Sequence, residues 1–310
     1  MTTFTSFDKP TLRDAMAATR RATIGARLLR RASFVRWGVR VDTAPAWCWL
    51  ALLAATLWPT WWWMTRRVMD RSDDPFGLLA LAALAVVAWQ QRLQLRAAPR
   101  LGWLAAALIG VVASTVAQGV LPALLVALVA LLSLAAGLAA FFPSTVATAP
   151  VIGLSVLSLP LLASLQFYAG YPLRVVTAEV SRWLLALGHD AQRSGASLLV
   201  DGQLVIVDAP CSGVQMAWLG YFTACVVALY FGRSNRAFLT RLPLVGVLVL
   251  TGNIVRNTVL VAAEASGHHL PNWLHEGVGL VALACVCGLV AWRMSSRENR
   301  VIAAAGVRHV

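Results

Sequence analysis

The chain has 310 residues, of which 59% are hydrophobic and only 13% are charged, whereas a soluble globular domain has about half apolar and about a quarter charged residues. Together with a mean hydropathy of +0.72, this composition excludes an ordinary soluble domain and predicts an all-α integral membrane protein. The net charge of +13 has to be compared with the predicted spans, because cytoplasmic loops of membrane proteins retain Lys and Arg. The five cysteines form no CxxC pair and no Cys/His cluster at zinc spacing, so we expect neither a disulfide framework nor a metal site.

An Arg-rich segment, residues 1–45, precedes the apolar part of the chain. Its composition is typical of an amphipathic helix on anionic lipid, of a basic and mostly disordered tail, and of a mitochondrial transit peptide. The transit peptide is the least favoured of the three, because these arginines serve equally well to fix the orientation of a membrane protein.

Eight apolar segments follow, and each is long enough, or nearly so, to cross a bilayer, which takes about 20 residues. In the almost uncharged stretch 101–168 the boundaries depend only on length and on helix breakers such as Pro143 and Pro150. The eight predicted spans are residues 46–64, 76–91, 101–118, 120–141, 148–168, 212–231, 243–262 and 273–292. Residues 293–310 form a tail after the last span.

The basic residues are unevenly distributed over the connecting segments. With the N-terminal segment inside, 19 of the 26 Lys and Arg residues fall on inner segments, six fall on outer segments, and Arg256 lies within a span. Nine of the 13 acidic residues fall outside. We therefore predict that both termini are cytoplasmic, and we interpret the net charge as a sign of topology and not of a nucleic-acid partner.

One outer segment, residues 169–211, is long. Residues 173–188 carry apolar positions at helical spacing and predict a surface helix on the membrane. Two β-prone runs, Leu198–Val200 and Gln203–Val207, are joined by Asp201-Gly202, a pair typical of a two-residue hairpin. We expect a small external cap made of one helix and one hairpin, too small to have a core of its own.

Reactive side chains within or beside membrane spans are rare and usually functional. Here Cys211 lies at the start of the sixth span, Arg256 within the seventh and His275 at the start of the eighth. The sixth and eighth spans are predicted to run inward and the seventh outward, so all three groups are expected near the outer face, with Arg256 about 9 Å deep at 1.5 Å per residue. Three consecutive helices are thus predicted to bring together a thiol, a guanidinium and an imidazole.

Each of these groups suits a step of acyl transfer. A thiol at a helix N-terminus and near an arginine is favoured as the thiolate, which makes Cys211 the candidate nucleophile. The backbone N–H groups of Ser212 and Gly213 could receive an oxyanion, with Arg256 as a fixed cation. His275 has a ring suited to proton transfer near neutral pH.

Other interpretations of these residues stay open. Asn253 shares a helix face with Arg256 and could orient it, but Arg256 could also be a structural cation, although the predicted spans offer no carboxylate at a similar depth. His275 could be an interface residue, and His268 and His269 are competing bases in the same outer loop. The other cysteines, Cys48, Cys225, Cys285 and Cys287, are interpreted as inert packing residues.

Three short motifs occur at the outer ends of successive late spans: Ala209-Pro-Cys-Ser-Gly, Asn253-Ile-Val-Arg, and His275 ahead of a glycine. In these residues the chain resembles the exosortase/archaeosortase family of polytopic membrane cysteine transpeptidases. The resemblance extends to Leu165-Gln-Phe-Tyr and to Asp74-Pro-Phe-Gly-Leu-Leu, and it covers most of the chain. It implies that Cys211 accepts the acyl group, that Arg256 stabilises charge and that His275 is the acid/base.

The resemblance also implies a function. The chain would be an enzyme of the bacterial cytoplasmic (inner) membrane with its site on the external, periplasmic face. It would cleave a C-terminal sorting tail from exported proteins and transfer the new C-terminus to a surface acceptor, such as a polysaccharide or a lipid-linked group, without a cofactor. Many members carry Ser-His-Gly where this chain has Asp73-Asp74-Pro75-Phe76-Gly77, and residues 1–45 are a longer leader than expected, so the subfamily and the sorting signal stay open.

Two functions of other classes compete with this one. A small-solute transporter or lipid flippase would use Arg256 as an anion site, although such proteins often contain internal repeats and we find none in the sequence. The chain could also be a non-catalytic assembly factor for surface polymer export, in which the three groups are relics.

Overall fold

The computed structural model describes residues 44–71, 73–206, 213–266 and 271–296. The chain divides into two compact units, residues 1–49 and 50–310, and the described helices from residue 50 onward belong to the second unit. The predictions made for residues 1–43 and for the C-terminal tail beyond residue 296 lie outside the described residues.

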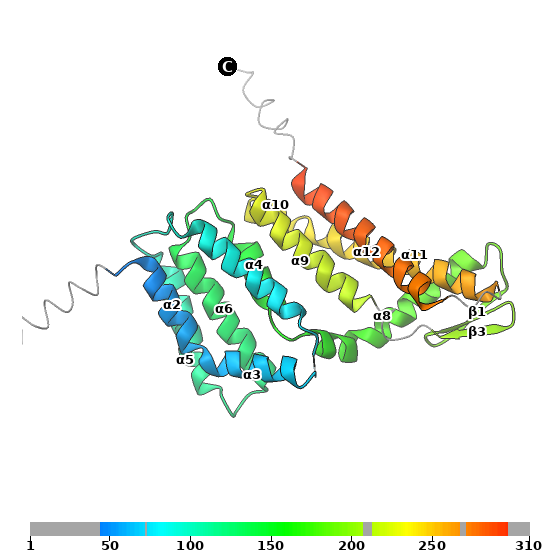
Figure 1. Cartoon of the computed structure of the whole chain (residues 1–310), viewed down its shortest axis with the longest axis horizontal. Helices are drawn as coiled ribbons and strands as arrows, with labels where there is room; N and C mark the ends of the chain where they lie inside the picture. Colours follow the sequence, from blue (N-terminus) through cyan, green and yellow to red (C-terminus); the bar gives the residue numbers. More distant parts are fainter. Residues whose placement is uncertain (1–43, 72, 207–212, 267–270, 297–310) are drawn as a thin grey trace, which may run out of the picture. The chain divides into compact units, whose positions relative to one another are not determined.

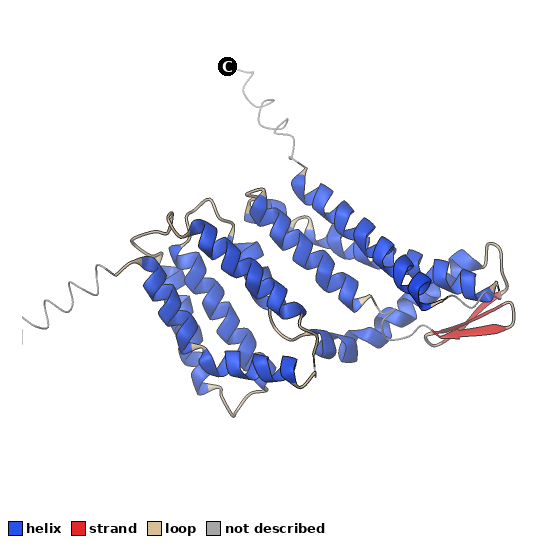
Figure 2. Cartoon of the chain, viewed as in Figure 1, coloured by secondary structure: helices blue, strands red, loops and turns tan. Residues whose placement is uncertain are grey.

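The described part is mainly helical, with one small sheet next to the helices (Figures 1 and 2). The helices are α2 Ala46–Thr56, α3 Trp58–Met69, α4 Phe76–Gln91, α5 Leu101–Val116, α6 Ala123–Phe141, α7 Thr148–Leu157, α8 Leu162–Leu185, α9 Val214–Tyr230, α10 Asn235–Leu239, α11 Leu242–Ala265 and α12 Asn272–Ser295. The strands are β1 Ala191–Ser194, β2 Ser197–Val200 and β3 Gln203–Ile206.

Apolar helices occupy the predicted spans, but the number of helices long enough to cross a membrane is smaller than eight. Within the described residues three pass by length and composition, namely α6, the stretch Asn235–Ala265 and Trp273–Ser295, and a fourth passes if α7 and α8 are counted as one bent crossing. The apolar helices α2, α4, α5 and α9 are shorter. At 1.5 Å per residue the 16 residues of α4 span about 24 Å, less than the roughly 30 Å of a hydrocarbon core. The all-α membrane class therefore agrees with the structure, and eight full spans do not follow from it.

The first predicted span, residues 46–64, is wrong as a single helix. Helix α2 ends at Thr56, and α3 starts anew with Pro59 in its first turn, where the missing N–H of a proline is tolerated. Helix α3 carries exposed tryptophans and two arginines, and it runs across the ends of α5 and α6 in Figure 1. This composition is typical of a helix at the level of the lipid headgroups.

The fifth predicted span, residues 148–168, is also wrong as a single helix, because the chain bends by 91° between α7 and α8. Pro160 lies in the break, and a residue that precedes a proline is disfavoured in helical conformation. After the break α8 continues through Pro172 to Leu185. The predicted surface helix 173–188 is therefore the second half of α8, and no helix ends at the predicted cap boundary of residue 169.

The cap contains a three-stranded antiparallel sheet in the order β1-β2-β3, and not only a hairpin. The predicted hairpin is confirmed as β2 and β3, with Asp201 (φ 49°) and Gly202 (φ 83°) in its turn, the left-handed pair that such a turn requires. Strand β1 was not predicted, because its sequence Ala-Gln-Arg-Ser shows no apolar alternation. The buried side chains of β2 pack on α8 and α11: Leu198 and Val200 lie against Ala178, Leu185 and Val261.

Hydrogen bonds connect the segments that the topology predicts to be inside. The N–H of Arg96 donates to the carbonyl of Phe141 (2.8 Å), and the N–H of Ala149 donates to the side chain of Asn235 (2.8 Å). Two arginines of the α9–α11 connection, Arg233 and Arg241, donate to the last carbonyls of α12, where positive charge is favourable. These connections share one end of the helices, and which membrane face this end occupies stays a prediction.

Candidate active site

The N-terminus of α9 lies at the end opposite those connections. Gly213 is the N-cap residue of α9 with φ +81°, a left-handed conformation that favours glycine. The first helical residue is Val214, so the predicted start of the span at residue 212 is corrected. Cys211 and Ser212 lie outside the described residues, and by sequence Cys211 is two residues before the N-cap.

Asn253 of α11 packs directly on this glycine. A Cβ added at Gly213 would lie 2.8 Å from Cγ of Asn253, so a larger residue would force the two helices apart. Asn253 is only 2% exposed, and its Nδ2 donates to Oγ1 of Thr177 on α8 (3.2 Å). The amide is therefore fixed between α8 and the turn that follows residue 211.

A second buried polar contact joins the same two helices one turn further along. Oγ1 of Thr258 donates to Oγ of Ser181 (3.1 Å), and both Thr177 and Ser181 are fully buried. Residues four apart on a helix share a face, and hydroxyl groups on that face connect apolar helices where water is scarce. The sequence analysis missed Thr177 and Ser181, although this spacing in an apolar helix was a usable signal.

Arg256 lies against α12. A Cβ added at Gly279 would lie 3.1 Å from Nε and 3.3 Å from Nη2 of Arg256, so the guanidinium rests on the α12 backbone where no side chain intervenes. His275, in the first turn of α12, is four residues before Gly279 and therefore on the same helix face. Helix α11 extends to Ala265, three residues beyond the predicted span, so Arg256 lies about 14 Å from the helix end at 1.5 Å per residue. Its depth of about 9 Å below the membrane face stays a prediction.

Helices α9, α11 and α12 all pack on one another and lie together in Figure 1. Gly213 meets Asn253 at the start of α9, and Arg256 meets Gly279 one turn further along α11. The described members of the predicted site, Gly213, Asn253, Arg256 and His275, are thus brought to the same end of three adjacent helices. The arrangement offers a cation and a histidine toward the end of the bundle where α9 begins, and Cys211 precedes α9 in the sequence.

The remaining candidate groups are two histidines and four cysteines. His268 and His269 lie outside the described residues. Cys48, Cys225, Cys285 and Cys287 are free thiols, and Cys225 is buried in α9 against Gly153. Within the described ranges no three His, Cys, Asp or Glu side chains come together as a metal site would need.

The cap contains a histidine–carboxylate pair that the sequence analysis also missed. Nδ1 of His189 lies 2.6 Å from Oδ2 of Asp201, and the N–H of Asp190 donates to Oδ1 of Asp201 (2.9 Å). The hydrogen bond to His189, followed by that to Asp190, holds the pKa of the Asp201 carboxyl below its ordinary value. The pair closes the end of the sheet at the turn between β2 and β3.

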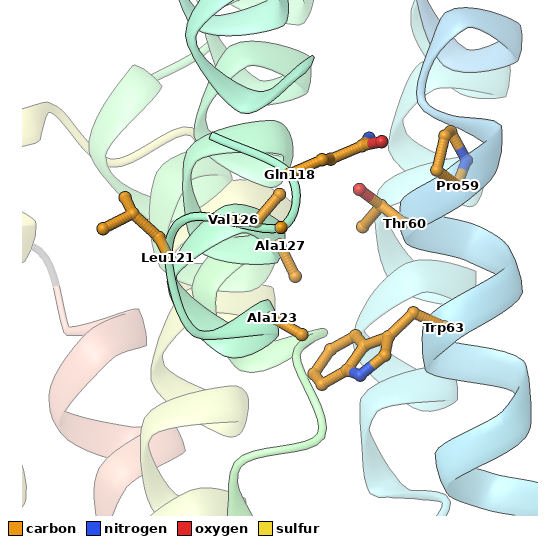
Figure 3. A pocket seen from close by; sticks show the side chains of 9 residues that line it. Pro59, Thr60, Trp63, Gln118, Leu121, Ala123, Val126 and Ala127 are labelled. Atoms are coloured by element: carbon orange, nitrogen blue, oxygen red, sulfur yellow. The ribbon is translucent and has the colours of Figure 1, made fainter. Parts of the chain in front are cut away.

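A pocket of about 140 Å³ lies between α3 and the turn that joins α5 to α6 (Figure 3). Thr60 and Gln118 point toward one another across it, and Trp63 lies at its edge. The residues that line it carry no titratable side chain, so this pocket supplies no group for acyl transfer.

A comparison with protein families found one match, in which the model of the transmembrane exosortase family covers residues 62–292. The chain belongs to this family. The matched region of this exosortase runs from α3 to α12 and contains Cys211, Arg256 and His275, so the family resemblance seen in the sequence is confirmed. Membership in this family, together with the apolar helices, establishes that the chain is an integral membrane protein. Membership also suggests that the chain acts as a membrane transpeptidase for sorting signals. Searches of curated proteins and of solved structures found no match.

Proposed function

We propose that this exosortase is a membrane-embedded cysteine protease and transpeptidase. It cleaves the C-terminal sorting signal of exported proteins and transfers the new C-terminus to a surface acceptor, from a site on the external face of the bacterial cytoplasmic membrane. The observation that supports this most is that Gly213 packs on Asn253 and Arg256 packs on Gly279 toward one end of α9, α11 and α12, and Cys211 lies two residues before Gly213 in the sequence.

In the first half-reaction the Cys211 thiolate attacks the carbonyl carbon of the scissile peptide bond. The carbonyl oxygen becomes an oxyanion, which accepts hydrogen bonds from the backbone N–H groups of Ser212 and Gly213 and is stabilised by the positive charge of Arg256. His275 donates a proton to the leaving nitrogen, the C–N bond breaks, and the tail departs as an amine. The remaining protein is held as a thioester on Cys211.

In the second half-reaction an acceptor hydroxyl or amine replaces the thiol. The neutral ring of His275 takes a proton from the acceptor as the acceptor attacks the thioester carbonyl, and Arg256 again faces the oxyanion. The C–S bond breaks, which releases the Cys211 thiolate and leaves the protein joined to the acceptor by an ester or amide bond. Water in place of the acceptor gives simple hydrolysis, so each step uses side chains of this protein without a cofactor.

Asn253 and Gly213 act on the geometry and not on the bonds. The amide of Asn253, held by Thr177, fills the space beside the N-cap of α9 and so limits how far Gly213 can move. Preorganised donors are effective because they do not have to reorient when charge develops.

The direct test is mass spectrometry of the C-termini of exported, tail-bearing proteins in cells that express either the parent enzyme or Cys211→Ala. We expect trimmed C-termini with the parent and intact tails with Cys211→Ala. Cys225→Ala is the matched control, because it also removes one thiol, and Cys225 is buried within α9 away from the site. This variant should process tails normally. A hydroxylamine-sensitive covalent adduct between enzyme and substrate should form only when Cys211 is present.

Intact tails in the parent cells would contradict the proposal and favour a transporter or a non-catalytic assembly factor. Normal trimming by a Cys211→Ala protein that is inserted in normal amounts would remove Cys211 as the nucleophile.

A further inference from the structure

The turn that joins α3 to α4 contains a buried carboxylate. Asp73 is 8% exposed as a residue and its side chain is completely covered, which is unusual for an acidic residue unless its charge is compensated. Its Oδ1 accepts hydrogen bonds from the N–H of Asp74 (3.0 Å) and from the N–H of Ala163 (3.2 Å). Its Oδ2 lies 3.6 Å from Nη2 of Arg67.

Through these contacts the α3–α4 turn stabilises the bend between α7 and α8. Ala163 is in the first turn of α8, whose own N-cap residue, Leu161, makes no capping hydrogen bond through its side chain. Asp73 therefore supplies this cap from a segment 90 residues away, where a negative charge is favoured by the helix dipole. On the other side of the break, Gly77 packs its backbone against the carbonyl of Ser158, and a Cβ at Gly77 would clash with it.

The same turn also reaches α9. The ring of Phe76 contacts Trp218, with 5.3 Å between centroids, and Trp218 stacks on Phe222 at 5.2 Å. Nε1 of Trp218 donates to the carbonyl of Leu157, the last residue of α7 (3.1 Å). Gln215, in the first turn of α9, adds a long contact of 3.5 Å from its Nε2 to Oδ2 of Asp74.

We propose that the segment Asp73–Gly77, acting through Trp218, is a positioning element of the active site. It fixes the first two turns of α9 against α7 and the α7–α8 break, while Asn253 fixes the N-cap of α9 from the side of α11. Two independent supports thus meet on the short segment that follows Cys211. The claim about catalysis rests on the proposed function, and the claim about the placement of α9 does not.

Trp218→Phe is the sharpest variant, because it removes the N–H donated to Leu157 and keeps an aromatic ring between Phe76 and Phe222. Trp292→Phe is the matched control, since Trp292 lies on α12 with 59% of its surface exposed. With the full-length enzyme in lipid vesicles and a tail-bearing reporter as substrate, we expect Trp218→Phe to lower kcat by about 10-fold with KM unchanged within about twofold. A misplacement of 1 Å can cost on the order of 100-fold. The same loss should follow from Asp73→Ala.

The placement of α9 can be measured without turnover. Spin labels at Gln215→Cys and Trp273→Cys, in a background with all five native cysteines replaced by serine, report the distance between the first turns of α9 and α12 by pulsed electron paramagnetic resonance. We expect a narrow distribution in the parent, a broadened or shifted one with Trp218→Phe, and no change with Trp292→Phe.

An unchanged distribution in Trp218→Phe would overturn the positioning role of this segment. A fall in kcat that only follows a fall in folded, inserted protein would overturn its role in catalysis. A parent enzyme without turnover of the reporter, combined with a broadened distribution in Trp218→Phe, would overturn the proposed function and retain the placement of α9.

Discussion

Replacement of Gly279 by alanine should raise stability and lower activity. Gly279 lies inside α12. At such a position alanine is preferred to glycine by on the order of 0.5–1 kcal/mol, because a chain with alanine loses less conformational entropy when it folds. The added Cβ would lie 3.1 Å from Nε and 3.4 Å from Cζ of Arg256. Since these contacts are tighter than ordinary van der Waals distances, the guanidinium has to move by a few tenths of an ångström.

The effect on turnover follows from this displacement. A shift of 1 Å in a reacting group costs on the order of 100-fold, so a few tenths of an ångström should cost about 3- to 10-fold. Complete loss of an oxyanion donor, about 100- to 1,000-fold, is the upper limit. Gly288→Ala is the matched control, because it lies on the same helix and an added Cβ there meets nothing within 4 Å.

The assay compares thermal unfolding and reporter processing for the two variants in lipid vesicles. We expect both to unfold at the temperature of the parent or above it, and only Gly279→Ala to lose turnover. Undiminished turnover in Gly279→Ala, or an equal loss in Gly288→Ala, would refute the argument that Arg256 acts from its position against α12.

Four further predictions concern Arg256, the N-cap of α9, the cap and the membrane topology. Arg256→Lys keeps the charge but loses the planar donors, so turnover should fall on the order of 100- to 1,000-fold at nearly normal abundance; parallel losses of abundance and activity would instead indicate a structural role. Gly213→Ala introduces a side chain at φ +81°, so thermal unfolding should show a loss of about 1–2 kcal/mol, and a neutral result would contradict the tight packing at that turn. Because the hydrogen bond to His189 lowers the pKa of Asp201 in the folded cap, its stabilisation is present above the unfolded pKa of about 3.9 and is lost as the pH falls through the lower, folded pKa. Hydrogen exchange of the sheet, corrected for intrinsic rates, should show this loss, and Asp201→Asn should abolish it. Reporter fusions at residue 195 and at the C-terminus should report opposite membrane faces, and an external C-terminus would mean a miscounted span.

Hydropathy alone located most of the helices, because apolar side chains in lipid leave the helix as the way to satisfy a spanning backbone. Helices α4, α6 and α12 begin or end within three residues of the predicted spans. The Asp201-Gly202 turn was equally local, since its two left-handed residues define the hairpin whatever surrounds it. The 91° break at residues 158–161 also had a local signal in Pro160, which the analysis of periodicity passed over.

Other features were decided by contacts between segments far apart in the chain. Strand β1 has no apolar pattern and exists because β2 offers it hydrogen-bonding partners. The sequence analysis only counted Asp73 among the acidic residues of the outer segments, but Asp73 is buried because it caps a helix 90 residues away.

The candidate site also combines residues with a signal in the sequence and residues whose role depends on contacts between distant segments. The sequence alone singles out positions 211, 256 and 275 as site candidates, because charged and reactive groups are rare in spans and therefore conspicuous. The residues that support them are less conspicuous: Thr177 beside Asn253 has only its spacing to Ser181 as a signal, and Gly279 beneath Arg256 has none. Only the packing of α8, α11 and α12 gives these residues a role, because the closeness of two helices depends on which small side chains face each other, and a single sequence does not record that pairing.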